Sequence, residues 1–132
     1  MKEVVLVAGG IFGALSVIFG AFGAHALKKY FNEEQLKSFE TGVKYQMYHA
    51  IILIISGITF PFTSSIQNIM AWFFMIGMIL FSFSIYGLTL SSARGKKIKI
   101  LGPVTPLGGL LLVAGWILLT INLAEIALYL RP

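Results

Sequence analysis

His25 and His49 are the residues of this chain whose side chains could best carry chemistry. They stand at the two edges of a charged segment between apolar stretches, and Tyr45 and Gln46 lie just before the second. Imidazole titrates near neutral pH, so these rings could respond to protons or contact a lipid headgroup. Two histidines can also ligate a metal or a haem iron. The structural alternative is that each ring hydrogen-bonds a neighbouring helix or loop, because an unsatisfied buried polar group costs about 1–3 kcal/mol.

The chain lacks several residue types on which enzyme active sites commonly depend. The chain contains no cysteine and no Asp, and its five acids are all Glu. Thiolate catalysis, disulfides, cysteine-ligated metals and nucleophile–base–acid sets built on Asp are therefore excluded. We expect a protein that is not an enzyme and that needs no cofactor or metal. Two alternatives stay open: a small transporter or channel with His25, Gln46 and His49 along a polar path, and a haem- or metal-binding redox subunit.

Long charge-free runs define the elements that must position these residues. Hydrophobic residues make up 58% of the chain and charged residues 11%, against roughly 45–50% and about 25% in soluble domains. Residues 4–27, 45–93 and 100–124 contain no Asp, Glu, Lys or Arg. About 20 apolar residues cross the hydrocarbon core, so the middle run can cross twice, with a turn at Pro61. We predict an all-α, four-helix transmembrane bundle in a single integral membrane domain, with spans near 4–27, 45–60, 66–91 and 104–128. The first span is expected to be retained, because its apolar core is too long for a signal peptide.

The basic residues predict how these spans are oriented. Eight of the ten lie in two loops that four spans would bring to one side, while Lys2 and Arg131 lie on the other. The positive-inside rule therefore places both loops in the cytoplasm and both termini outside. Anionic lipid headgroups are the natural partners of such loops, and nucleic acid is not. The expected headgroup contacts are Lys28, Lys29, Arg94, Lys96, Lys97 and Lys99.

The segment between the first two spans carries a helix signal of its own. Asn32 can cap a helix whose third residue is Gln35, in the manner of a capping box. An apolar stripe then recurs at helical spacing under a polar face, at Leu36, Phe39, Val43 and Met47. This pattern predicts an amphipathic cytoplasmic helix that lies at the membrane surface before helix two and bends near Gly42.

Small residues repeat at helical spacing on the predicted spans. Such residues let helix backbones approach closely in lipid. The positions expected to pack against another helix are Gly9, Gly13, Gly20, Gly77, Gly108 and Gly115. The partner helix could belong to the same chain or to a second copy, so these faces also make self-association an expectation.

Three stretches resemble a known family. GAFGAHAL (20–27), TGVKYQMYHA (41–50) and GPVTPLGGLLLVAGW (102–116) are similar to the bacterial family called domain of unknown function 423, which is related to vertebrate transmembrane protein 256. The resemblance implies a small, multi-pass protein of the bacterial cytoplasmic (inner) membrane, and it brings no established reaction. Its motif positions in this chain are Gly23, His25, Tyr45, Gln46, His49, Gly102, Pro103, Pro106, Gly108 and Gly115.

The expectation from the sequence is thus a non-enzymatic membrane protein. It would have a structural or accessory role, through contact with membrane lipids and through association with itself or with another membrane protein.

Overall fold

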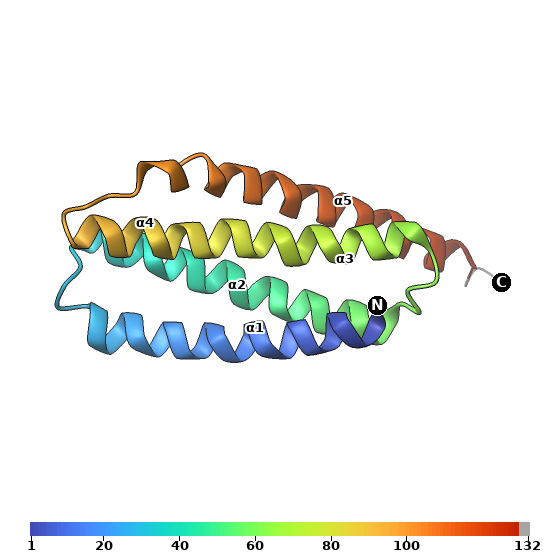
Figure 1. Cartoon of the computed structure of the whole chain (residues 1–132). Coiled ribbons are helices and arrows are strands. Elements are labelled where there is room, and N and C mark those ends of the chain that lie inside the picture. The colour runs from blue at the N-terminus through green and yellow to red at the C-terminus, as the bar shows by residue number, and fades with distance from the viewer. Residues whose placement is uncertain (130–132) are drawn as a thin grey trace.

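The chain folds into four long helices joined by short connections (Figure 1). The computed structural model describes residues 1–129, and no strand occurs in that range. The expected all-α class with four helices is confirmed. The first helix consists of α1 (Lys2–Phe22) and a π turn, η1 (Gly23–Leu27), and the second is α2 (Glu33–Thr59). The third helix is made of α3 (Ser65–Met78), the π turn η2 (Ile79–Phe83) and α4 (Ser84–Ala93). A 3₁₀ turn, η3 (Lys99–Leu101), precedes the fourth helix, α5 (Val104–Tyr129).

Three of the four helices have the length and apolar composition of a membrane span. They cover Lys2–Leu27, Ser65–Ala93 and Lys99–Tyr129. α2 falls outside this set because Lys44, Gln46 and His49 interrupt its apolar sequence. The fourth crossing and the detailed span limits therefore stay predictions. Arg131, expected at the outer side of the last span, lies outside the described residues.

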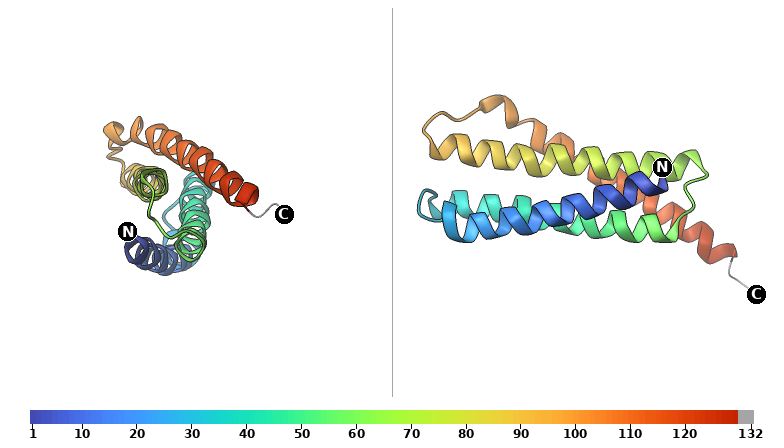
Figure 2. Two further views of the ribbon diagram at one scale, coloured as in Figure 1. Left: turned by 90° about the vertical axis from the view of Figure 1, so that its right-hand side faces the viewer. Right: turned by 60° about the horizontal axis from the view of Figure 1, so that its bottom comes forward.

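α2 occupies the centre of the bundle. α1 packs along α2 and α3 packs along α5, while α2 also contacts α3, η2 and α4. It runs obliquely between α1 and the third helix in Figure 1, and the end-on view in Figure 2 shows it between α1 and α5. Residues 28–32 and 94–103 form the connections at one end, and the N-terminus lies at the other end with the 60–64 turn (Figure 1). Both basic connections thus share one end of the molecule.

The small-residue face of α1 lies against α2 of the same chain. A Cβ added at Gly9 would stand 2.7 Å from Cγ1 of Ile54 and 3.0 Å from the Ala50 carbonyl oxygen. Gly20 faces Val43, and Gly13 faces Ala50 at a looser distance. The two backbones can approach this closely because α1 carries no side chain at these contacts.

α5 approaches the third helix through two glycines. Gly108 lies against the backbone of η2, where an added Cβ would meet the Phe81 nitrogen and stand 2.8 Å from the Gly77 carbonyl oxygen. Gly115 lies under the Phe74 ring, 2.9 Å from the position of its missing Cβ. Backbone atoms cannot give way as a flexible side chain can, so Gly108 is the tighter of the two contacts.

The start of α2 confirms one expectation and corrects another. The Gln35 backbone N–H donates to Asn32 Oδ1 at 2.8 Å and the Asn32 N–H donates to Gln35 Oε1 at 3.0 Å, which completes the predicted capping box. The helix expected before helix two is present and runs into helix two near Tyr45, but there is no break at Gly42, because one α-helix continues from Glu33 to Thr59. Gly42 is buried where the Tyr86 ring would stand 2.7 Å from an added Cβ. Within the apolar stripe, Phe39 is buried and packs against the Tyr86 ring at 4.9 Å between centroids.

The contact at Gly108 makes a direct prediction about stability. Gly108→Ala should lower the free energy of unfolding by about 1–3 kcal/mol, because the new methyl group meets backbone that must shift. The matched control is Gly10→Ala on the open face of α1, where nothing lies within 4 Å of an added Cβ. Chemical unfolding in mixed micelles, followed by circular dichroism, measures both. Equal stability of the two variants would contradict the packing described for α5.

Candidate functional site

Gln46 joins three helices through its side-chain amide. The residue is fully buried on α2. Its Nε2 donates to the Phe12 carbonyl of α1 at 2.9 Å, and its Oε1 accepts from the Tyr86 hydroxyl of α4 at 2.8 Å. Ser16 adds a parallel link one turn further along α1, donating to the Val43 carbonyl at 3.0 Å. One amide thus satisfies its own polar atoms and ties α1 and α4 to α2.

His49 joins α2 to α5. It is 4% exposed, and its Nε2 accepts a hydrogen bond from the Trp116 indole N–H at 3.2 Å. Its Nδ1 lies 2.7 Å from the Tyr45 carbonyl oxygen. An indole nitrogen only donates and a carbonyl only accepts, so the ring is neutral with its proton on Nδ1. Both ring nitrogens are therefore engaged within the chain.

His25 lies far from His49. It is exposed in η1, where Gly23 packs against the Phe39 ring of α2. Phe39 precedes His49 by ten residues, which corresponds to about 15 Å along a helix. The two histidines are therefore not placed to hold one metal or haem between them, and the alternative in which they line one polar path stays a prediction. Within residues 1–129, no group of three or more His, Cys, Asp or Glu is placed to hold a metal ion.

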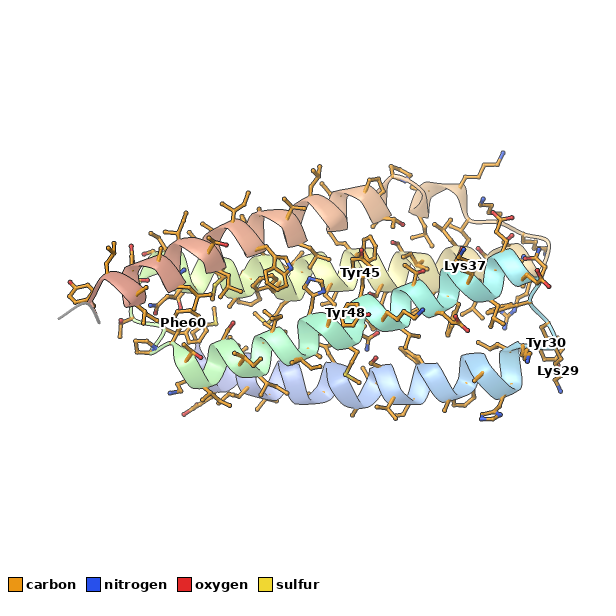
Figure 3. All side chains as sticks on the ribbon, turned by 180° about the vertical axis from the view of Figure 1, so that it is seen from behind. Lys29, Tyr30, Lys37, Tyr45, Tyr48 and Phe60 are labelled. Atoms are coloured by element: carbon orange, nitrogen blue, oxygen red, sulfur yellow. The ribbon has the colours of Figure 1, made fainter. Side chains whose placement is uncertain are left out.

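Tyr45 contributes its backbone to this site and not its hydroxyl group. Its side chain is 41% exposed, and its ring packs against Phe81 at a centroid distance of 4.7 Å. Tyr48 is 56% exposed on the same open side of α2 (Figure 3). Of the four predicted residues His25, Tyr45, Gln46 and His49, the structure brings the last three together on α2 and leaves His25 apart.

The partners of these residues come from elsewhere in the chain and were missed by the sequence analysis. Neither Trp116 nor Tyr86 was singled out from the sequence. Both carry an N–H or O–H donor inside an apolar helix, and such a donor needs an acceptor. This need for an acceptor is the feature of the sequence that could have identified both residues. Two further polar contacts join α5 to the third helix: Ser84 Oγ lies 2.7 Å from Thr105 Oγ1, and Asn122 Nδ2 lies 3.9 Å from Met70 Sδ.

The basic end forms a second candidate surface. Its six predicted headgroup contacts, Lys28, Lys29, Arg94, Lys96, Lys97 and Lys99, are all exposed. The second connection is held in a turn by Ser91, whose carbonyl accepts from the Lys96 N–H at 3.0 Å and whose Oγ accepts from the Ile98 N–H at 3.2 Å. Gly95 adopts a positive φ of 71° in this turn. Lys29 extends over the Tyr30 ring, with Nζ 5.0 Å from the centroid (Figure 3).

Comparison with known proteins assigns a family to these features. The family model described as "Protein of unknown function (DUF423)" matches residues 19–109. This chain belongs to the DUF423 family. The matched range begins before His25, covers all of α2 and the second basic connection, and ends just after Gly108.

Curated bacterial relatives extend the similarity over most of the DUF423 chain. A UPF0382 membrane protein of Staphylococcus haemolyticus is 40% identical over 117 residues, which cover 89% of this chain and 92% of that protein. The UPF0382 membrane protein YwdK of Bacillus subtilis is 36% identical over 121 residues, covering 90% and 94% respectively. No solved structure matches. These names and the three candidate spans identify the chain as a multi-pass membrane protein of an uncharacterised family.

The hydrogen bond between Tyr86 and Gln46 can be tested with a double-mutant cycle. Tyr86→Phe should lower the free energy of unfolding by about 1 kcal/mol, because it leaves Gln46 Oε1 buried without a donor. In a Gln46→Met background the same change should cost almost nothing, since no acceptor remains. Tyr48→Phe, on the exposed side of α2, is the control for loss of a hydroxyl group. Equal costs of Tyr86→Phe in both backgrounds would refute the link.

Proposed function

We propose that this DUF423 protein catalyses no reaction and serves as a structural or accessory component of the membrane. It contacts anionic lipids at its basic end and associates with copies of itself or with another membrane protein. The observation that supports this most is how the polar side chains divide. The side chains of Gln46 and His49 form hydrogen bonds that join neighbouring helices. Six basic side chains, in contrast, are exposed at one end of the molecule.

The proposal includes a fourth crossing by α2. This helix has 27 residues, which gives it a length of about 40 Å, more than the roughly 30 Å of hydrocarbon. Lys44 is exposed on it, and a lysine at that depth can extend its ammonium group toward the headgroups. Four crossings put both basic connections on one side, in agreement with their common end in Figure 1.

The positive-inside rule then makes that side cytoplasmic, with both termini extracytoplasmic. The bacterial relatives support the cytoplasmic membrane as the location. Each Lys or Arg near an anionic surface is worth about 1 kcal/mol of attraction. A cluster of six is therefore a substantial electrostatic contact with that leaflet.

Self-association would use faces that the fold leaves open. Other helices of the same chain already pack against Gly9, Gly20, Gly108 and Gly115. These four glycines are therefore not available for contact with a second copy. The outer faces of α1 and α5 expose apolar side chains instead, including Val17, Leu110, Val113 and Ile117. Gly10 has nothing within 4 Å of an added Cβ, so another helix could approach α1 closely there.

Lipid dependence of stability tests the proposal. In nanodiscs of phosphatidylglycerol the protein should melt at a higher temperature than in phosphatidylcholine with the same acyl chains. Replacing Lys96, Lys97 and Lys99 with Gln should reduce that difference by about half, because it removes three of the six exposed cations. The phosphatidylcholine discs are the internal control, since melting there should not change.

Native mass spectrometry of the same nanodiscs checks the second part, and a homo-oligomer is expected. Equal melting temperatures in the two lipids would reject the lipid contact. A strictly monomeric protein that recruits no other membrane protein would reject the association.

A further inference from the structure

A groove opens between α1 and α4 near the basic end. Its volume is about 500 Å³ and its lining is almost entirely apolar. Five aromatic rings form most of its walls: Phe19 and Phe22 of α1, Phe39 of α2, Phe83 of η2 and Tyr86 of α4. The volume falls within the range of about 300–1,000 Å³ that ligand pockets occupy.

The floor of the groove is preformed. The Tyr86 ring packs edge-on against Phe19 at 5.1 Å and lies 4.9 Å from Phe39 between centroids. Its hydroxyl group is held by Gln46, so this ring cannot turn to fill the space. Phe22 and Phe83 lie at the rim, 55% and 37% exposed. An empty groove forfeits dispersion contacts along its whole wall, and in a bilayer the available apolar filler is a lipid chain.

Two basic residues follow shortly after the residues that line the groove at the basic end. Leu27 and Leu90 line it at the basic end. Lys28 directly follows Leu27, and Arg94 comes one turn after Leu90, on the same face of the helix; both cations are exposed. No acidic residue lines this groove. By contrast, the polar pocket between α2 and α4 includes both Glu34 and Lys97 in its wall. The α1–α4 groove thus combines an apolar wall with two basic residues beside its end.

The dimensions of the groove also fit a lipid. On the third helix the lining runs from Phe83 to Leu90. Arg94 follows one turn later, so Phe83 and Arg94 are separated by about 16 Å of helix. This equals one leaflet of the hydrocarbon core, half of about 30 Å. An acyl chain lying along the groove would thus bring its phosphate to the level of Lys28 and Arg94.

We propose that this groove is a specific site for one anionic phospholipid. One acyl chain lies along Phe19, Phe39 and Tyr86, and the phosphate contacts Lys28 and Arg94. The inference rests on the lipid contact proposed above and narrows it to one molecule per chain at a defined place. The basic end as a whole attracts the leaflet, whereas the groove retains a single lipid.

Native mass spectrometry after detergent washing tests this site. Protein is extracted from nanodiscs of equal phosphatidylglycerol and phosphatidylcholine with matched chains, and the retained lipids are counted. The wild type should keep one phosphatidylglycerol per chain. Leu90→Trp fills the groove and should lose it, whereas Leu110→Trp, on the exposed face of α5, should keep it. Circular dichroism confirms that both variants are folded.

Removing the two cations beside the groove tests the site without changing the groove's apolar wall. Lys28→Gln with Arg94→Gln should lower the preference for phosphatidylglycerol about thirtyfold, since two surface cations are lost. Lys96→Gln with Lys97→Gln removes the same charge at the same end without touching the groove lining, and the preference should stay within about twofold.

The groove site would be overturned if both double variants lost the same preference for phosphatidylglycerol. It would also be overturned if a folded Leu90→Trp protein kept its lipid. Either result would leave the general lipid contact unaffected. A wild-type protein that neither retains phosphatidylglycerol nor melts higher in it would overturn both.

Discussion

The hydrogen bonds of Gln46 are the constraint on which this fold depends. A polar side chain within hydrocarbon is costly unless it finds a partner, and α2 carries Gln46 and His49 within its apolar stretch. It is also the helix that touches α1, α3 and α4. The least apolar helix thus occupies the centre, where neighbours supply a carbonyl, a hydroxyl group and an indole N–H.

The glycine contacts follow from the same requirement. The Phe12 carbonyl reaches Gln46 at 2.9 Å because Gly9 and Gly20 let α1 lie close to α2. On the other side, Gly108 and Gly115 seat α5 against the third helix, which brings Trp116 to His49. Small residues and buried polar residues therefore act together: the first allow close approach, and the second make one packed arrangement better than its alternatives.

Local features of the structure could be predicted from the sequence, and long-range pairings could not. The four helices and the Asn32–Gln35 capping box rest on composition and on residues three apart, and both were predicted correctly. The amphipathic helix was expected at the membrane surface because an apolar stripe indicates a covered face without identifying the neighbour that covers it. In this chain Phe39 of the stripe packs against Tyr86, 47 residues further along the sequence. His49 was singled out, but its partner Trp116 is 67 residues away, beyond the reach of any local pattern.

The central claim is that α2 crosses the membrane in the middle of the bundle, and cysteine labelling tests it most directly. The chain has no cysteine, so single variants Lys29→Cys, Thr63→Cys and Lys97→Cys can each be probed with an impermeant thiol reagent on right-side-out spheroplasts. We predict that Thr63→Cys reacts from outside, while the other two variants react only after permeabilisation. The opposite result is that Thr63→Cys and Lys29→Cys are both protected while Lys97→Cys reacts from outside. That result would mean that α2 does not cross the membrane.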